Sequence, residues 1–188
     1  MKTNILMTIA FLIFVLTAGY SQNTDKDIKA ADKVEKKIEL QKLIENLIDS
    51  KQFVFIANRA LPMGGASIDL TTNSNYVKFN PDYIDSYMPF FGEAYSVDYN
   101  VDTGVKFEGK PEMFTIKRLK KNRGYDILTK VSLVRDTYDL RLEVGLEGNS
   151  TLTISSFNRS TISYNGQIVP PEKQKEESKD AKGDAKSL

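Results

Sequence analysis

The stretch YDLRLEVGL, residues 138–146, is the longest alternation of apolar and polar side chains in the sequence. Successive side chains in a β-strand face opposite sides of the sheet, so this stretch predicts a strand with one apolar face and one solvent-exposed face. The apolar face would carry Tyr138, Leu140, Leu142, Val144 and Leu146. Such a strand is typical of an antiparallel sheet that is covered on one side.

The same period of two recurs in shorter segments along most of the chain after residue 51: residues 53–57, 67–70, 95–99, 105–107, 114–116, 152–154 and 162–164. Turn-forming residues such as Gly64-Gly65, Asn122-Arg123-Gly124 and Gly148-Asn149 separate the segments. Many short strands joined by tight turns predict a mostly β fold. We expect an antiparallel meander that closes into a lipocalin-like barrel, with a β-sandwich as the alternative.

Residues 31–50 follow a different period. Apolar side chains recur at helical spacing here, while lysines and glutamates fill the positions between them. The apolar set is Val34, Ile38, Leu43, Ile44, Leu47 and Ile48. This pattern predicts one amphipathic helix packed against the barrel, or alternatively a helix that binds a partner or a membrane surface.

The two ends of the chain differ from this central region. Residues 1–21 combine one lysine, the apolar run 5–16 and small residues at Gly19 and Ser21, which predicts a cleavable signal peptide. The apolar run is shorter than the ~20 residues that span a bilayer. We expect cleavage after Ser21, or after Gly19, followed by a flexible linker at 22–30, one domain at 31–169 and a disordered charged tail at 170–188. The predicted location is therefore periplasmic or secreted, with no membrane span after cleavage.

Composition excludes several classes of function. Lysine plus arginine (26) and aspartate plus glutamate (25) almost balance, so no basic field for nucleic acid is expected. The sequence contains no histidine, which excludes a Ser-His-Asp triad and removes the commonest zinc ligand. It contains no cysteine, so the protein is not expected to be a lipoprotein or to carry disulfides. No cofactor is predicted.

Three segments hold candidate binding residues. Arg59 follows the first predicted strand and is a candidate anion ligand. Residues 85–95 hold Tyr87, Phe90 and Phe91 around Pro89 and Gly92, and these rings would either grip a ligand or plug the end of the barrel. The polar segment 155–166 holds Asn158 and Arg159 and ends in an Asn-Gly hairpin signal.

Asp98, Asn100 and Asp102 stand at alternate positions before Gly104, which resembles a calcium-binding loop. The match is poor, because the glycine comes one place late and Gly109 stands where a bidentate glutamate belongs. A hairpin turn is the simpler interpretation of this segment.

Residues 53–65 (FVFIANRALPMGG), 87–95 (YMPFFGEAY) and 158–166 (NRSTISYNG) resemble the hallmark stretches of domain of unknown function 4251, a family of exported proteins of Bacteroidetes-type bacteria. The resemblance covers roughly residues 38–169. It implies a lipocalin-like fold and an envelope location, and supplies no activity. It also implies that Asn58, Arg59, the Tyr87 segment, Asn158 and Arg159 cluster together.

These observations together favour a non-catalytic binding module for a small apolar or glycan-like ligand, or for a partner protein of the envelope. A barrel of this size can hold one small ligand. The expected site is the barrel mouth, lined by Arg59, Tyr87, Phe90, Phe91, Asn158 and Arg159. The alternatives are a structural or assembly component of an envelope complex and, less favoured, an enzyme that uses carboxylates or a lysine.

Overall fold

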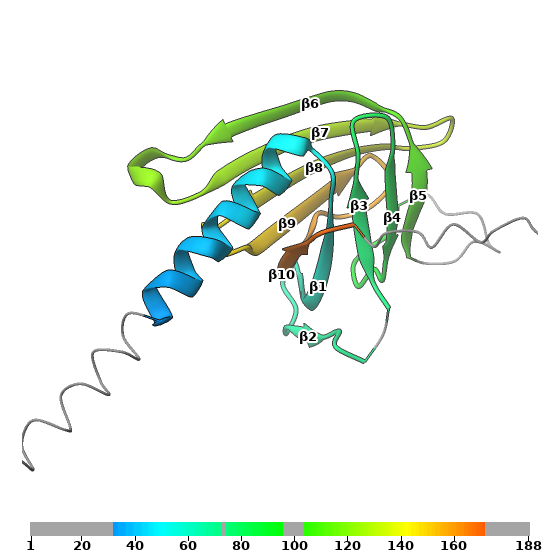
Figure 1. The fold of residues 1–188 in the computed structure, drawn as a ribbon. Helices are drawn as coiled ribbons and strands as arrows, with labels where there is room; N and C mark the ends of the chain where they lie inside the picture. The colour runs from blue at the N-terminus through cyan, green and yellow to red at the C-terminus, as the bar shows by residue number, and fades with distance from the viewer. Residues whose placement is uncertain (1–31, 73, 96–103, 172–188) are drawn as a thin grey trace, which may run out of the picture.

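The computed structural model describes residues 32–72, 74–95 and 104–171, which form one helix and ten strands (Figure 1). Residues 32–50 are helical. The strands are β1 (Phe53–Pro62), β2 (Ile68–Asp69), β3 (Tyr76–Phe79), β4 (Ile84–Met88), β5 (Val105–Gly109), β6 (Pro111–Arg118), β7 (Tyr125–Ser132), β8 (Thr137–Val144), β9 (Asn149–Ser156) and β10 (Ile162–Val169). A short 3-10 helix, Lys120–Asn122, lies between β6 and β7.

Nine strands form a single antiparallel sheet in the order β5-β4-β3-β1-β10-β9-β8-β7-β6. The last strand pairs with the first, and β5 and β6 are the two edges, joined through Lys110. β2 pairs with β1 alone and stands off the barrel (Figure 1). The predicted mostly β, antiparallel barrel is confirmed as nearly closed, and one continuous sheet replaces the sandwich alternative.

Aromatic side chains bridge the barrel from inside near its open seam. Phe107 of β5 stacks on Tyr138 of β8 with ring centroids 4.2 Å apart. Phe79 of β3 meets Phe114 of β6 edge-on at 6.3 Å. Aromatic pairs in these arrangements stabilise beyond the area that they bury. The two edges are thus held together by packing where backbone pairing ends.

Inward side chains fill the core. β8 buries alternate residues along its whole length, as its sequence predicts. Tyr164, Phe53, Phe55 and Phe79 are among the largest fully buried side chains of the described chain. These rings and the aliphatic residues around them belong to one hydrophobic cluster. The barrel interior therefore has the packed character of an ordinary protein core.

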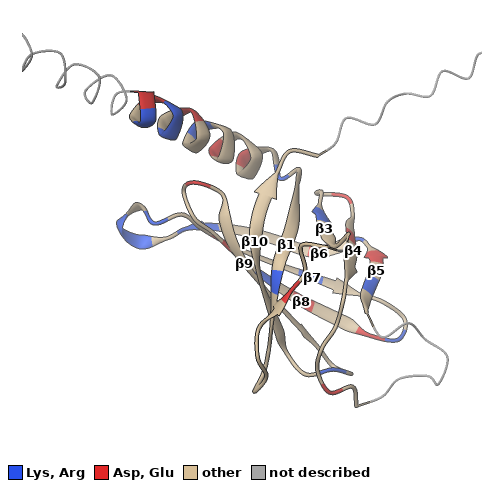
Figure 2. Ribbon diagram, turned by 90° about the horizontal axis from the view of Figure 1, so that it is seen from below, with Lys and Arg blue, Asp and Glu red and all other residues tan. Residues whose placement is uncertain are grey.

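The helix crosses the end of the barrel that carries the β6–β7 and β8–β9 turns (Figure 2). Ile44, Leu47 and Ile48 are buried there, and a Cβ at Gly148 would lie only 2.8 Å from Ile44 Cδ1. Ion pairs flank this contact: Lys37 Nζ lies 2.7 Å from Glu147 Oε1 and Arg118 Nη1 lies 3.7 Å from Glu45 Oε1. Glycine at 148 lets the helix approach the turn closely.

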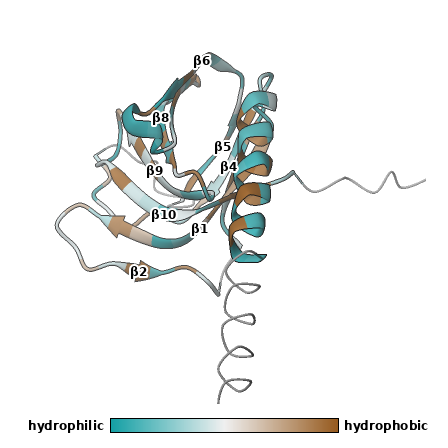
Figure 3. Ribbon diagram, turned by 60° about the vertical axis from the view of Figure 1, so that its left-hand side comes forward, coloured by the Kyte–Doolittle hydropathy of each residue, from teal (hydrophilic) through white to brown (hydrophobic). Residues whose placement is uncertain are grey.

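The predicted apolar stripe of the helix docks only in its C-terminal half. Val34 and Ile38 remain exposed, because the first helical turns extend beyond the sheet (Figure 1). Leu43 is exposed as well, next to the buried Ile44. Hydrophobic residues, coloured brown, recur along the helix in Figure 3. No helix among the described residues is both long and apolar enough to cross a membrane.

Three strands were not expected from the sequence. The sequence predicts no element for β3 or β7, and the aromatic segment 85–95, whose first half forms β4, is interpreted from the sequence as a loop. The predicted signal peptide and linker, nearly all of the predicted tail, most of the predicted strand 95–99, and Asp98, Asn100 and Asp102 lie outside the described residues.

Candidate functional site

Residues 89–95 cross the barrel end opposite the helix and are hydrogen-bonded to the β9–β10 turn. The backbone N–H of Tyr95 donates to Asn158 O at 2.8 Å, and that of Ser160 donates to Glu93 O at 2.9 Å. The buried Tyr164 hydroxyl donates to Pro89 O at 2.7 Å. The aromatic segment is therefore tied down as a cover on this end of the barrel.

Three of the predicted site residues, Phe90, Asn158 and Arg159, meet in this cover, and we call them the clasp. The Arg159 guanidinium donates to Gly104 O at 2.9 Å and lies over the Phe90 ring at 5.3 Å. Asn158 Nδ2 donates to Arg135 O at 2.9 Å. The narrow hollow beside Phe90 and Arg159 has no room for a water molecule. The clasp thus joins neighbouring loops by packing and hydrogen bonds.

The other three predicted site residues lie elsewhere. Tyr87 is exposed on the outside of β4, stacked on Tyr76 at 6.0 Å and covered by Lys106 Nζ at 4.1 Å from its ring centroid. Phe91 is exposed in the loop that follows β4. Arg59 pairs in register with Asn165, six positions along the chain from Arg159. Arg59 and Arg159 line different hollows, the first with Asp69 and Thr71 and the second with Phe90, so the six residues do not line one pocket.

Arg59 belongs to a different feature, a β-bulge in β1. The β1–β10 register shifts between Ala57 and Arg59, so Asn58 is the extra residue. Asn58 O accepts a hydrogen bond from Leu70 N at 3.0 Å. A Cβ at Gly166, which pairs with Ala57, would lie 2.0 Å from the backbone oxygen of Ile56. Bulges of this kind re-aim side chains and are frequent beside functional sites.

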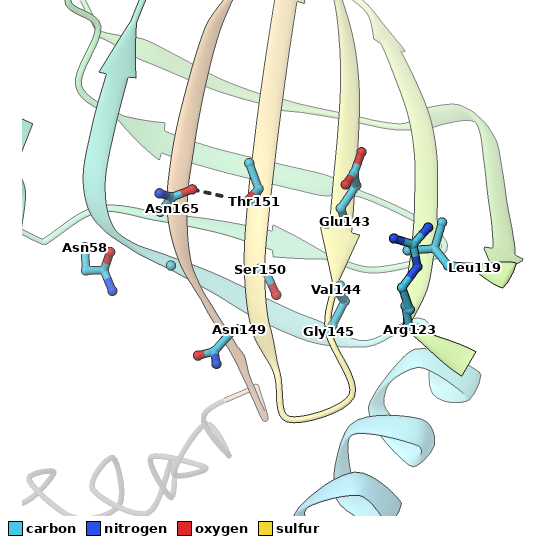
Figure 4. A pocket seen from close by; sticks show the side chains of 11 residues that line it. Asn58, Leu119, Arg123, Glu143, Val144, Gly145, Asn149, Ser150, Thr151 and Asn165 are labelled. Atoms are coloured by element: carbon cyan, nitrogen blue, oxygen red, sulfur yellow. Dashed lines mark hydrogen bonds between the residues drawn. The ribbon is translucent and has the colours of Figure 1, made fainter. Parts of the chain in front are cut away.

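The exposed side chain of Asn58 borders a hollow of about 480 Å³ on the outer surface of the sheet (Figure 4), which we call the polar groove. Its lining consists of Asn58, Leu119, Arg123, Glu143, Val144, Gly145, Asn149, Ser150, Thr151, Asn165 and Gly166. An adjoining hollow of about 380 Å³ shares Asn58 and Asn165 and adds Arg59, Asp69 and Thr71, and we include it in the polar groove. The two hollows extend between β2 and the β6–β7 turn over the outer faces of β8, β9, β10 and β1.

The model for domain of unknown function DUF4251 matches residues 35–168 of this chain. The chain belongs to the DUF4251 family. A solved crystal structure of a DUF4251 family protein from Bacteroides eggerthii has a similar fold, with a TM-score of 0.54 and 20% sequence identity. That similarity covers 70% of this chain and 87% of the other. Among curated proteins, no match to the chain was found. The predicted family is confirmed, and the solved relative supports the fold alone.

The polar groove of this DUF4251 domain holds charges of both signs. Asp69 accepts hydrogen bonds from Thr71 Oγ1 at 2.5 Å and Thr71 N at 2.9 Å, and these bonds, with the nearby charge of Arg59, lower the pKa of its carboxyl. Glu143 Oε1 lies 3.2 Å from Nη2 of Arg141, a residue that does not itself line the groove. Two cations (Arg59 and Arg123) thus stand with two carboxylates (Asp69 and Glu143) over the two hollows.

Amides and hydroxyls supply the rest of the hydrogen-bonding surface. Thr151 Oγ1 donates to Asn165 Oδ1 at 3.1 Å, which leaves the amide nitrogen of Asn165 on the side away from Thr151 (Figure 4). Donors and acceptors therefore alternate along the groove without a dominant charge. Within the described residues, no group of three or more carboxylates is placed to hold a metal ion. The arrangement can donate hydrogen bonds to a polar group and accept them from it.

Sequence reasoning missed most of the groove. Arg59 was predicted as a ligand residue, but Glu143 was assigned to a solvent-exposed strand face and Thr151 to no feature. Arg123 and Asn165 were assigned to turns. The predicted Asn-Gly hairpin turn is wrong, because Asn165 and Gly166 lie within β10. The resemblance to DUF4251 did include Asn58 and Asn165 in its hallmark stretches. Their presence in these stretches pointed to the groove, but it did not show which hallmark residues lie next to one another in the fold.

Proposed function

We propose that this DUF4251 domain is a non-catalytic binding protein of the cell envelope, and that its polar groove binds a glycan-like, polyhydroxylated ligand. The observation that carries the proposal is the hollow of about 480 Å³ beside the Asn58 bulge. It is lined by amides, hydroxyls and charges of both signs, which can donate to and accept from sugar hydroxyls. A few well-placed polar groups of this kind commonly fix a ligand's orientation.

An apolar ligand inside the barrel has less support. Phe53, Phe55 and Tyr164 occupy the interior, and the clasp is packed across the mouth that was expected to bind. Export rests on the N-terminal pattern of a lysine, the apolar run 5–16 and the small residues Gly19 and Ser21. Envelope glycans would be available to a protein in that compartment.

A glycan array followed by isothermal titration calorimetry tests the binding function. Asn58→Ala and Asn165→Ala should each weaken binding of an array hit about tenfold, which corresponds to about 1.4 kcal/mol and to one hydrogen bond left unmade. Asn46→Ala removes an exposed amide from the helix that does not line the groove, and it should leave the Kd unchanged. An array without hits, or hits unaffected by both groove variants, would refute the proposal.

A second candidate is an assembly role through the helix, because Val34, Ile38 and Leu43 are exposed on its surface. In-cell crosslinking would then recover a partner that Ile38→Lys abolishes and Asn46→Lys retains. Equal recovery with both variants, or none with the unmodified protein, would count against this role.

A further inference from the structure

A ladder of short polar side chains leads from the polar groove along the outer faces of β9 and β10. Three cross-strand pairs form it: Thr151 with Asn165 at 3.1 Å, Thr153 with Ser163 at 2.9 Å, and Ser155 with Thr161 at 3.0 Å. The intervening residues, including Leu152, Ile154 and Tyr164, are buried, so the ladder faces outward. The ladder is a continuous strip of hydroxyl and amide groups that begins in the groove.

Longer side chains of β8 border this strip. Glu143, Arg141 and Asp139 stand in register with Thr151, Thr153 and Ser155, respectively. Arg141 is fixed by two hydrogen bonds to the Asp126 carboxylate, from Nε at 2.9 Å and from Nη2 at 3.2 Å. The ladder of short side chains therefore lies beside a row of longer, charged side chains on β8.

The end of the ladder away from the polar groove borders another hollow, of about 320 Å³, lined by Lys130, Ser132, Thr137, Asp139, Ser155, Ser156 and Phe157. Phe157 is 89% exposed at this hollow. Its backbone N–H donates to Asp136 Oδ1 at 3.2 Å, which fixes the turn that carries the ring. Single exposed apolar side chains are common. What distinguishes Phe157 is the polar hollow beside it, which it shares with a lysine, a carboxylate and several hydroxyls.

We infer that the ligand is a linear oligosaccharide that lies along the β9–β10 ladder, with one sugar in the polar groove and another stacked on the Phe157 ring. This inference rests on the proposed function and names its ligand class. The C–H face of a sugar ring is apolar and packs on an aromatic face, while its hydroxyls hydrogen-bond to polar groups beside the ring. Lys130, Asp139 and Ser155 are placed to receive those hydroxyls.

A ligand that spans the length of the ladder must contain more than one sugar. Thr151 and Ser155 are four residues apart on one strand, or ~13 Å at ~3.3 Å per residue. A single six-membered ring cannot bridge that distance, whereas an extended chain of several sugars can. Affinity should therefore rise with chain length until the ligand reaches Phe157.

Calorimetric titration with cello-oligosaccharides and chito-oligosaccharides, from the monosaccharide to the hexasaccharide, tests this inference. The unmodified protein should bind the longest member of a recognised series at least tenfold more tightly than the monosaccharide. Phe157→Ala should abolish that gain and leave the monosaccharide Kd unchanged, while Phe157→Tyr retains the gain. Val134→Ala is the matched control, because Val134 is fully exposed on the neighbouring turn and does not line the hollow.

The outcomes separate this inference from the function on which it rests. Binding that needs Asn165 but gains nothing from chain length supports the polar groove and overturns the extended ligand. Binding of neither oligosaccharide series overturns the inference, and an array that also has no hits overturns the proposed function. Co-sedimentation with phosphatidylethanolamine–phosphatidylglycerol vesicles, lost equally in Phe157→Ala and Val134→Ala, would make this end a membrane surface and overturn the inference as well.

Discussion

The structure assigns Arg159 to the stability of the fold, so Arg159→Ala should destabilise the protein. The substitution removes a charge-assisted hydrogen bond to Gly104 O and the contact of the guanidinium with the Phe90 ring. Hydrogen bonds to charged groups contribute about 1.5–3 kcal/mol. A cation over an aromatic ring contributes about 0.5–2 kcal/mol, more as it is desolvated. Because the two contributions are not additive, we expect a total loss of about 2–4 kcal/mol.

Urea denaturation followed by far-ultraviolet circular dichroism measures this loss as a lower midpoint at an unchanged m-value. Arg59→Ala is the matched control, because the Arg59 side chain is exposed beside the polar groove and its loss should cost less than about 0.5 kcal/mol. In glycan titrations the two variants should exchange roles, with Arg59→Ala weakening binding and Arg159→Ala leaving it intact. An Arg159→Ala protein as stable as the unmodified one would refute the structural assignment of the clasp.

Three further substitutions probe the barrel at other points. Gly166→Ala should lower the free energy of unfolding by at least about 2 kcal/mol in urea denaturation, because the added Cβ would lie 2.0 Å from Ile56 O and a backbone atom cannot move aside as a side chain can. Gly65→Ala is the control, because its Cβ would make ordinary contacts and the change should be nearly neutral. Ile48→Ala should lower the free energy of unfolding by about 2–5 kcal/mol, because it leaves a cavity where the helix packs on the barrel. The same change at the exposed Ile38 should lower it little, and equal losses would contradict the helix packing described above. Tyr164→Phe should cost about 1–3 kcal/mol at neutral pH, because Pro89 O loses its donor. Burial raises the pKa of the Tyr164 phenol. The stability that this phenol contributes is therefore complete below the ordinary tyrosine pKa of about 10 and is lost as the pH rises above that value. Tyr164→Phe should make the loss of stability at alkaline pH less steep, and an unchanged slope would contradict this expectation.

The sequence predicted several strands by the rule that apolar residues alone face inward, although β3, whose buried Val77 and Phe79 obey the same rule, was not predicted. β8 follows this rule throughout, and its burial alternates accordingly. β4 breaks it, because the buried Ser86 stands between Ile84 and Met88 and donates its hydroxyl hydrogen to Val105 O at 2.9 Å. The neighbouring Tyr87 is exposed, so here the polar side chain is buried and the aromatic one faces solvent. A hydrogen bond that is formed only in the folded sheet thus hides this strand from any reading by hydrophobicity.

β7 was hidden in the same way. Tyr125, Ile127, Thr129 and Val131 are its buried positions, and threonine is the polar member of the set. Thr129 Oγ1 donates to Met113 O at 2.8 Å on the neighbouring strand, which satisfies the hydroxyl in the core. Buried polar groups of this kind are tolerated because they are hydrogen-bonded, and the partner is known only once the strands are paired.

The candidate site was less predictable than the fold because strand register decides which residues meet. Arg59 and Asn165 are more than a hundred residues apart in the sequence, yet they pair across β1 and β10. The bulge at Asn58 shifts that pairing by one residue, and a shift of one residue exchanges the two faces of a strand. The hallmark residues could therefore be recognised from the sequence, while their division between the clasp and the polar groove could not.

The packing of the barrel supports the proposal that recognition takes place on the outside of the sheet. The helix occupies one end of the barrel through Ile44, Leu47 and Ile48, and the clasp occupies the other. Without cysteine the sequence can form no disulfide, so stability must come from a filled interior and from these two covers. Hollowing the barrel for a ligand would remove the aromatic contacts that hold its open seam together. The outer faces of β8, β9 and β10 are free of that constraint, and it is there that the polar groove, the ladder and the Phe157 hollow lie in line.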